Sequence, residues 1–341
     1  MGLFSFFNKE IAMDLGTANT IVICNDKIVV DEPSIVAIDK RKNNKIIAVG
    51  KKAKLMDGKE NPNIGTIRPL KDGVIADFEM AQHLIREFIK MSGVARNVLS
   101  PAIRMIVCIP SGITNVEERA VRESAEQAGA KEIRLIHEPM AAAIGIGIDV
   151  TEPLGHMIVD IGGGTAEIAV ISLGGIVCKK SINVAGDEFN NNIYEHMRQH
   201  HNMVIDSRMA ECIKIEAGAA ISELETPPDD FRACGRDLLS GIPHEIQVSY
   251  KEVAHALDKS VVRIESAILE TLSATPPGIA ADIYQNGIYL TGGGALLRGL
   301  DKRISEKTHL QVHIAEDPLH AVARGTGIAL KSFDKFDFLI K

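Results

Sequence analysis

An internal repeat constrains the fold of this chain more than any other feature of its sequence. Residues 14–23 read DLGTANTIVI, and residues 160–171 read DIGGGTAEIAVI. Each segment follows three apolar residues and has the pattern of a strand, an acid, a glycine-rich bend and a second alternating strand. Asp14 matches Asp160 at an offset of 146 residues, which is close to the size of one domain. The repeat predicts two similar domains, each opening with a hairpin whose turn carries glycine, threonine and an acid.

The rest of the chain alternates between short apolar strands and helices. Strands are expected at 105–109, 134–136 and 288–290, and an apolar 3.6-residue spacing predicts a helix over 80–88 that ends before Gly93. Further helices are expected to begin at Pro139, at a capping box of Asn115 with Glu118, and behind a cap at Asp187. This alternation is typical of an α/β protein with a mainly parallel sheet.

Composition narrows the class of protein. The chain has 341 residues, 45% of them hydrophobic and 24% charged, which suits a globular protein of two domains. No apolar run approaches the roughly 20 residues that a membrane span needs. The net charge of −7 and the absence of tryptophan argue against nucleic acid as a partner. The odd set of five scattered cysteines and the absence of a signal peptide predict a cytoplasmic protein.

The two glycine turns have the character of phosphate loops. Glycine lets backbone N–H groups point into one concavity, where they can hold phosphate oxygens. One such turn alone is better explained as an ordinary hairpin. Two matching turns and a third glycine run at 291–295 favour a nucleotide site. Asp14 and Asp160 beside phosphates make sense with Mg²⁺ or its water shell between them, so the residues predict a Mg-nucleotide held between two domains.

These residues together resemble the actin/Hsp70/sugar-kinase superfamily and, more closely, the MreB family of bacterial actins. The matching stretches run in order over nearly the whole chain: IAMDLGTANT, VDEPSIVA, RPLKDGVIADF, HEPMAAAIG, VDIGGGTAEIAVIS, AGDEFN, IKIEAGAAI, LTGGGALLRGLD and DPLHAVARGTG. The resemblance implies an α/β actin-like ATPase fold, with two duplicated domains, a small inserted subdomain on each, and the nucleotide in the interdomain cleft.

The expected division of the chain follows the repeat and two polar insertions. The core of domain I is expected at 1–32, 67–147 and 318–341, with its small subdomain at 33–66. The core of domain II is expected at 148–184 and 247–317, with its small subdomain at 185–246. Helices near 139–148 and 320–331 match the crossing between the two domains. Their small residues would let the backbones approach closely; they are Ala141, Ala142, Gly145, Ala323, Gly325 and Gly327.

The resemblance also implies roles for single residues. Asp14 and Asp160 match the acids that organise Mg²⁺ through its waters. Glu138 matches the acid that positions the attacking water, with Thr165 beside it. Residues matching the nucleotide contacts are Gly16, Thr17, Ala18 and Asn19 in the first phosphate loop, Gly162, Gly163 and Gly164 in the second, Glu211 and Lys214 at the ribose and adenine, and Gly292, Gly293, Gly294 and Ala295 in the adenosine loop.

Simpler interpretations of some of these residues stay open. Glu138 also suits the N-terminus of a helix, where its charge meets the helix dipole. Glu211 and Lys214 also have the spacing of an ordinary surface pair. His137 stands where the family usually carries a second acid, so altered pKa values are expected nearby. The pair His200-His201 is expected to be a solvated helix end, because no acid or cysteine lies at the spacing of a metal site.

The implied function is an ATP-dependent, filament-forming bacterial actin with slow ATP hydrolysis. Its expected partners are copies of itself in double filaments, the cytoplasmic membrane, and membrane-bound proteins of cell shape and cell-wall synthesis. Its expected location is the cytoplasm, peripheral to the inner face of the cell membrane. The alternatives are a small-molecule kinase of the same superfamily or an ATPase adaptor that forms no filaments.

Two segments are candidate membrane anchors. On a helical wheel, Leu3, Phe4, Phe6 and Phe7 fall within about 160°, as in an amphipathic helix. The same residues also suit a buried start of the first strand. The second candidate is the loop near Val94, Val98 and Leu99.

Overall fold

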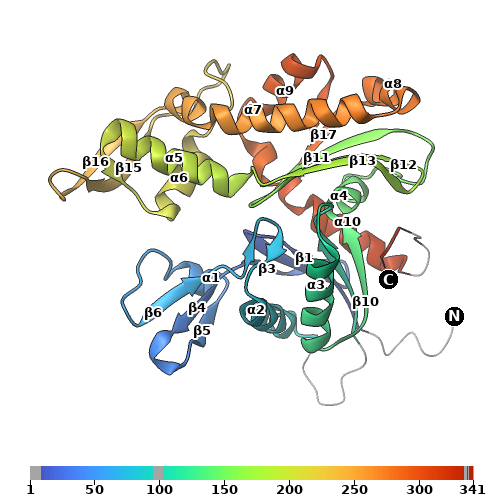
Figure 1. Ribbon diagram of the computed structural model, residues 1–341, viewed down its shortest axis with the longest axis horizontal. Coiled ribbons are helices and arrows are strands. Elements are labelled where there is room, and N and C mark those ends of the chain that lie inside the picture. Colours follow the sequence, from blue (N-terminus) through green and yellow to red (C-terminus); the bar gives the residue numbers. More distant parts are fainter. Residues whose placement is uncertain (1–8, 95–102, 334–335, 337, 341) are drawn as a thin grey trace.

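Two five-stranded sheets form the frame of the protein (Figure 1). The computed structural model describes residues 9–94, 103–333, 336 and 338–340. The first sheet has the order β10-β9-β1-β2-β3, with β1 (Lys9–Leu15), β2 (Asn19–Cys24), β3 (Lys27–Pro33), β9 (Ile103–Ile109) and β10 (Ala130–His137). The second has the order β13-β12-β11-β17-β18, with β11 (His156–Ile161), β12 (Ala166–Ser172), β13 (Gly175–Ile182), β17 (Ile288–Thr291) and β18 (Val312–Ile314).

The pairing of the strands confirms the internal repeat. Strand β1 lies antiparallel to β2 and parallel to β9, and β11 lies antiparallel to β12 and parallel to β17. The outer pairings also agree: β3 and β13 are antiparallel to their neighbours, whereas β10 and β18 are parallel. The expectation of a mainly parallel sheet was wrong. Half of each sheet is antiparallel, because its first three strands follow one another through tight turns, which join only antiparallel strands.

Helices and sheets alternate in layers. Helices α2 (Phe78–Met91) and α3 (Asn115–Gln127) pack on one face of the first sheet, and α4 (Glu138–Gly145) and α10 (Ala321–Lys331) lie between the two sheets. The far face of the second sheet is covered by α5 (Gly186–His201), α6 (Ser207–Ala217), α7 (Tyr250–Ala274), α8 (Pro277–Asn286) and α9 (Leu300–Thr308). Strand alternation produces this order: Ile11 and Met13 of β1 face α2, whereas Ala12 faces α4 and α10.

Two small sheets lie on the same side of the molecule and face each other (Figure 1). One is formed by β4 (Val36–Asp39), β5 (Lys45–Val49) and β6 (Ile64–Ile67), beside the short helix α1 (Lys51–Lys54). The other is formed by β14 (Met203–Val204), β15 (Phe231–Asp237) and β16 (Pro243–Val248). A hairpin of β7 (Leu70–Lys71) and β8 (Val74–Ile75) follows the first, and 3₁₀ turns span Lys40–Lys42, Gly293–Leu296 and Pro318–His320.

Two expected helix caps were wrong in detail. The capping box of α3 is Thr114 with Glu117, one residue earlier than expected: the Thr114 N–H donates to the Glu117 carboxylate at 2.8 Å. Because Thr114 keeps an extended backbone, the helix begins after it. Helix α5 begins after Ala185 with no side-chain cap, and Asp187 lies in its first turn. The other predicted helices are confirmed, including Pro139 in the first turn of α4.

Helices α4 and α10 cross with almost no space between their backbones, as the small residues predicted. A Cβ atom on Gly145 would lie 1.8 Å from the carbonyl oxygen of Ala321. A Cβ atom on Gly325 would lie 1.7 Å from the carbonyl oxygen of Ala141. The Arg324 guanidinium donates across the crossing to the Gly145 carbonyl at 2.9 Å. Only glycine therefore fits at these two positions.

We expect Gly325→Ala to lower the free energy of unfolding by about 3 kcal/mol, because even one methyl group must push the helices apart. Urea denaturation measures this change. Gly278→Ala is the matched control, since Gly278 lies in a helix and a Cβ atom there meets nothing within 4 Å. The control should stay within about 1 kcal/mol of the parent. Equal stability of the two variants would contradict the close crossing.

The segments with a predicted membrane role are mostly outside the structural description. Leu3, Phe4, Phe6, Phe7, Val98 and Leu99 lie outside the described residues. Val94 is described and is only 5% exposed, packed in the core with α2, so including it in a surface anchor was wrong. Among the helices of the described ranges, none is long and apolar enough to cross a membrane.

Candidate functional site

The two glycine turns meet at the ends of β1 and β11. A Cβ atom on Gly163 would lie 2.6 Å from the Cβ of Ala18, and one on Gly164 would lie 2.8 Å from Oγ1 of Thr17. A glycine at the middle of such a turn is expected to have a left-handed backbone, but this expectation was wrong for Gly163, because its φ is not in the positive range. Glycine is required there by the close approach of the two loops rather than by its backbone angles.

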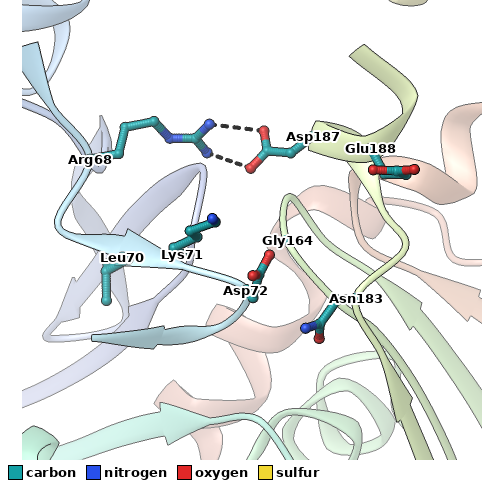
Figure 2. Close-up of a pocket in the computed structure, with 8 residues that line it drawn as sticks. All are labelled: Arg68, Leu70, Lys71, Asp72, Gly164, Asn183, Asp187 and Glu188. Carbon is teal, nitrogen blue, oxygen red and sulfur yellow. Dashed lines mark hydrogen bonds and ion pairs between the residues drawn. The ribbon is translucent and has the colours of Figure 1, made fainter. Parts of the chain in front are cut away.

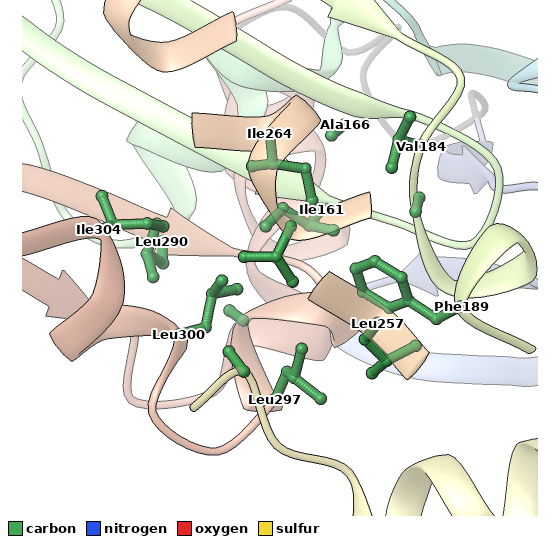
Figure 3. Close-up of a cluster of buried hydrophobic side chains, with 14 of the residues drawn as sticks. Ile161, Ala166, Val184, Phe189, Leu257, Ile264, Leu290, Leu297, Leu300 and Ile304 are labelled. Atoms are coloured by element: carbon green, nitrogen blue, oxygen red, sulfur yellow. The ribbon is translucent and has the colours of Figure 1, made fainter. Parts of the chain in front are cut away.

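The third glycine run packs against the second turn. Gly292 has a φ of +77°, which favours glycine, and a Cβ atom there would lie 2.6 Å from Oδ1 of Asp160. A Cβ atom on Gly294 would lie 2.2 Å from Cγ2 of Ile161. Ile161 is buried in the cluster with Leu290, Leu297 and Leu300 (Figure 3). This core anchors the second and third glycine segments to each other.

Three carboxyl groups gather beside these turns. Asp160 is 5% exposed, and the Thr291 hydroxyl donates to its Oδ1 at 3.0 Å. Burial raises the pKa of Asp14 to about 7; the charge of Asp160 adds to this rise and His320 opposes it. Burial raises the pKa of Asp160 to about 6. The hydrogen bond from Thr291 opposes this rise, and the charge of Glu167 adds to it.

Glu138 completes this acidic group at the first residue of α4. Burial raises its pKa well above the usual range, and the nearby carboxyl groups of Glu167, Asp160 and Asp14 add to the rise. No lysine or arginine of the described ranges forms an ion pair with Asp14, Glu138 or Asp160. An acidic cluster without a compensating cation fits a divalent metal that arrives with a nucleotide.

We expect the nucleotide-free protein to lose stability through these groups as the pH rises from about 4 to about 7. The folded chain holds the Asp14 proton up to a pKa of about 7, whereas the unfolded chain releases it near 3.8. The folded state therefore binds more protons in this interval, and stability falls by up to about 1.4 kcal/mol per pH unit for each group. Denaturant unfolding of the parent and Asp14→Asn measures it. A stability difference that stays constant with pH would contradict this assignment.

Glu167 is a site residue that sequence reasoning missed. It is fully buried on β12, directly opposite Asp160 in the strand register. Its carboxylate accepts hydrogen bonds from the backbone N–H of Ser111 at 3.0 Å and from the hydroxyls of Ser111 and Ser181. Because Ser111 follows β9 and Ser181 lies in β13, Glu167 ties the two sheets together. The available signal was an acid within the apolar strand AEIAVIS.

Two ion pairs connect the two parts of the protein that carry the small sheets. Arg68 donates to both oxygens of Asp187, at 3.0 and 2.8 Å (Figure 2). Its guanidinium also donates to the Thr17 carbonyl at 3.1 Å. Nζ of Lys54 lies 3.0 Å from Oε2 of Glu211. These contacts join α1 and the segment after β6 to α5 and α6.

Glu211 and Lys214 lie on the same helix, α6, but contact different partners. Glu211 pairs with Lys54, and the Lys214 ammonium donates to the Gly186 carbonyl at 3.1 Å. Burial lowers the pKa of Lys214, and the negative charges of Glu211 and Asp187 oppose this fall. Lys214 therefore lies beside the second glycine turn, since a Cβ atom on Gly186 would be 3.6 Å from Cα of Gly163.

A pocket of about 330 Å³ opens beside the second glycine turn (Figure 2). Of the expected nucleotide residues, it includes only Gly164; it is lined by Arg68, Leu70, Lys71, Asp72, Gly164, Asn183, Asp187 and Glu188. Thr165 lies next to it, against Gly73 of the β7–β8 turn. His137 lies in a different pocket with Met140 and Lys179, where burial and Lys179 lower its pKa.

Comparison with known proteins agrees with this geometry. The protein family described as MreB/Mbl protein matches residues 8–337. The cell shape-determining protein Mbl of Bacillus subtilis is 44% identical over 96% of this chain and 98% of its own length. The cell shape-determining protein MreB of Escherichia coli is 46% identical over 96% of this chain and 95% of its own length. MreB 5 of Spiroplasma citri, solved bound to AMPPNP, is 36% identical with a TM-score of 0.89, covering 96% of this chain and 97% of that one.

Proposed function

The chain belongs to the MreB/Mbl protein family of cell shape-determining actin homologues, and from this premise we propose that it is a filament-forming ATPase. It binds ATP in the cleft, assembles on the inner face of the cytoplasmic membrane and directs cell-wall synthesis there. The observation that carries the nucleotide assignment is the meeting of two glycine turns, each with an acid beside it whose pKa burial raises. The relative solved with AMPPNP supports it.

The proposed nucleotide contacts follow the three glycine segments. Residues 16–19 and 162–164 offer backbone N–H groups to the phosphates, because glycine lets the two loops approach so closely. Residues 292–295 and the helix α6, with Glu211 and Lys214, bind the adenosine end. Asp14 and Asp160 would hold Mg²⁺ through water, and the bound cation would neutralise phosphate charge.

Glu138 is the proposed positioning group for the attacking water. Phosphoryl transfer requires an oriented nucleophile more than covalent chemistry by the protein. Glu138 stands at the start of α4, close to Asp14, Asp160 and Glu167. Burial raises its pKa and the negative charge of these neighbours adds to the rise, and a cation in the cleft would return it to the carboxylate form. Thr165 is proposed to assist it.

The four-part division of the chain into two cores and two small subdomains also stays a proposal. It is supported by the two small sheets, which fall within or close to 33–66 and 185–246. The pairs Arg68–Asp187 and Lys54–Glu211 link these parts, so that opening of the cleft must break them.

We propose that copies of this chain form double filaments that attach to the membrane through Leu3, Phe4, Phe6 and Phe7, with cell-shape and cell-wall synthesis proteins as further partners. We expect deletion of residues 2–7 to release filaments from liposomes without stopping assembly. Each apolar side chain contributes at most about 1.5–3 kcal/mol, so one copy binds weakly and a filament binds by avidity. Co-sedimentation with liposomes measures this, and binding should vary little with salt. Unaltered co-sedimentation after the deletion would exclude this anchor.

Light scattering combined with phosphate release tests the proposed function against its alternatives. A filament-forming ATPase scatters light after ATP is added and releases phosphate slowly. A kinase would transfer phosphate to a small molecule without a rise in scattering. An adaptor with an inactive site would show neither response.

A further inference from the structure

Four histidines and a glutamate gather where the end of α5 meets the start of α7. His196, His200 and His201 lie in the last turns of α5, and Glu252 and His255 lie on α7. The ring centroids of His196 and His200 are 4.4 Å apart, and those of His196 and His255 are 6.5 Å apart. His196 and His201 follow Gly186, the first residue of α5, by 10 and 15 residues, so they lie about 15 and about 22 Å along the helix from the second glycine turn. The cluster is therefore separate from the nucleotide site.

Three of these side chains bring possible metal ligands together. Nε2 of His196 lies 2.9 Å from Oε1 of Glu252, and Nε2 of His201 contacts the same oxygen. The ligand atoms of all three residues lie within 4.8 Å of one another. Two imidazoles and one carboxylate are a known ligand set for Zn²⁺. Bonds of about 2.0–2.2 Å in tetrahedral geometry place neighbouring ligand atoms about 3.3 Å apart, so small side-chain shifts suffice.

We propose that His196, His201 and Glu252 form a binding site for one divalent transition-metal cation of the Zn²⁺ class. The three ligands leave a fourth position for water. The bound cation would connect the C-terminal end of α5 to the first turn of α7. His200 and His255 are exposed and do not belong to the ligand set.

Burial and protonation suit this chemistry. The side chains of His196 and Glu252 are 11% and 23% exposed. Burial lowers the pKa of His196, whereas the hydrogen bond and charge of Glu252 oppose this fall. Because the pKa is lowered overall, the imidazole ring stays neutral, as a metal ligand must be. Burial raises the pKa of Glu252, but hydrogen bonds from His201 and His196 outweigh this and keep it a carboxylate. Ser249 fixes the position of Glu252 by accepting its backbone N–H at 3.3 Å.

The sequence predicted that His200 and His201 both lie at a solvated helix end, and this prediction was correct only for His200. His201 is partly buried against Glu252, which lies 51 residues further along the chain. The acid that completes the ligand set therefore could not be found from local spacing. The competing explanation is an acid–base cluster that packs α5 against α7 and binds no metal.

Zinc titration of the full chain separates the two explanations. The protein is prepared without a histidine tag, treated with chelator, desalted and titrated with Zn²⁺ by calorimetry in the absence of nucleotide. One Zn²⁺ should bind per chain, and His201→Ala and Glu252→Gln should each weaken binding at least about tenfold. His200→Ala and His255→Ala are the matched controls and should bind within about twofold of the parent. Circular dichroism checks that each variant is folded.

Cobalt substitution provides a second readout. Four-coordinate Co²⁺ with imidazole ligands should give a visible absorption band in the parent and in His255→Ala, but not in His201→Ala. The acids of the nucleotide cleft offer only oxygen ligands and would not produce it. The proposal is overturned if the parent binds no stoichiometric Zn²⁺, or if His201→Ala and Glu252→Gln bind it as tightly as the parent.

Discussion

Glu138→Ala should retain nucleotide binding but slow phosphate release by about 100-fold or more, the usual effect of losing a positioned base. The residue stands at the start of α4, beside the carboxyl groups of Asp14, Asp160 and Glu167. Removing its carboxyl leaves the phosphate loops intact, so affinity for ATP should change little. Filaments should then persist longer, because they leave the ATP state more slowly.

Two further variants sharpen this test. Glu132→Ala removes an exposed acid from β10, the strand that leads to Glu138, and loses only a surface ion pair with Arg104. It should turn over at the parent rate. Glu138→Gln keeps an oxygen that can hold a water but cannot accept its proton, so it separates positioning from base catalysis. Unchanged turnover in Glu138→Ala would remove Glu138 from the mechanism.

Gly163→Val should abolish ATP binding and, with it, ATP-dependent assembly. The first carbon of the new side chain would lie 2.6 Å from the Cβ of Ala18, so the two phosphate loops must separate. Backbone N–H groups that depend on that approach can no longer converge on the phosphates. Titration with a fluorescent ATP analogue should show affinity reduced by more than about 100-fold, equal to about 2.7 kcal/mol.

The matched control is Gly278→Val, since a Cβ atom at Gly278 meets nothing within 4 Å. The control should bind ATP like the parent, and circular dichroism should show that both variants are folded. Normal affinity in a folded Gly163→Val would show that the loop contact is not needed for the nucleotide.

The repeat and the motifs predicted the two glycine turns at the centre of the candidate site because they are local features. Asp14 and Asp160 each precede a glycine turn within a few residues, and equivalent strands then place both turns at one junction. The wrong details concern properties that short patterns do not determine. The backbone angle of Gly163 depends on how two loops meet, and the cap of α3 depends on which residue keeps an extended backbone before the helix.

The parts that were missed depend on contacts between distant segments. Arg68 and Asp187 are 119 residues apart in the sequence. The carboxylate of Glu167 accepts a hydrogen bond from Ser111, which is 56 residues away in the sequence. A buried acid such as Glu167 is stable only because hydroxyl and backbone donors from both sheets surround it. Such a set of donors exists only after the two sheets have packed, so the sequence pattern alone did not predict it.

Negative-stain electron microscopy on a lipid monolayer tests filament formation most directly. With ATP and Mg²⁺, the full chain should form double filaments on the lipid surface, and without nucleotide the monolayer should stay bare. Gly163→Val, imaged in parallel, should form none. A bare monolayer with ATP, from folded protein that still binds the nucleotide, would contradict the assignment as a membrane-associated filament.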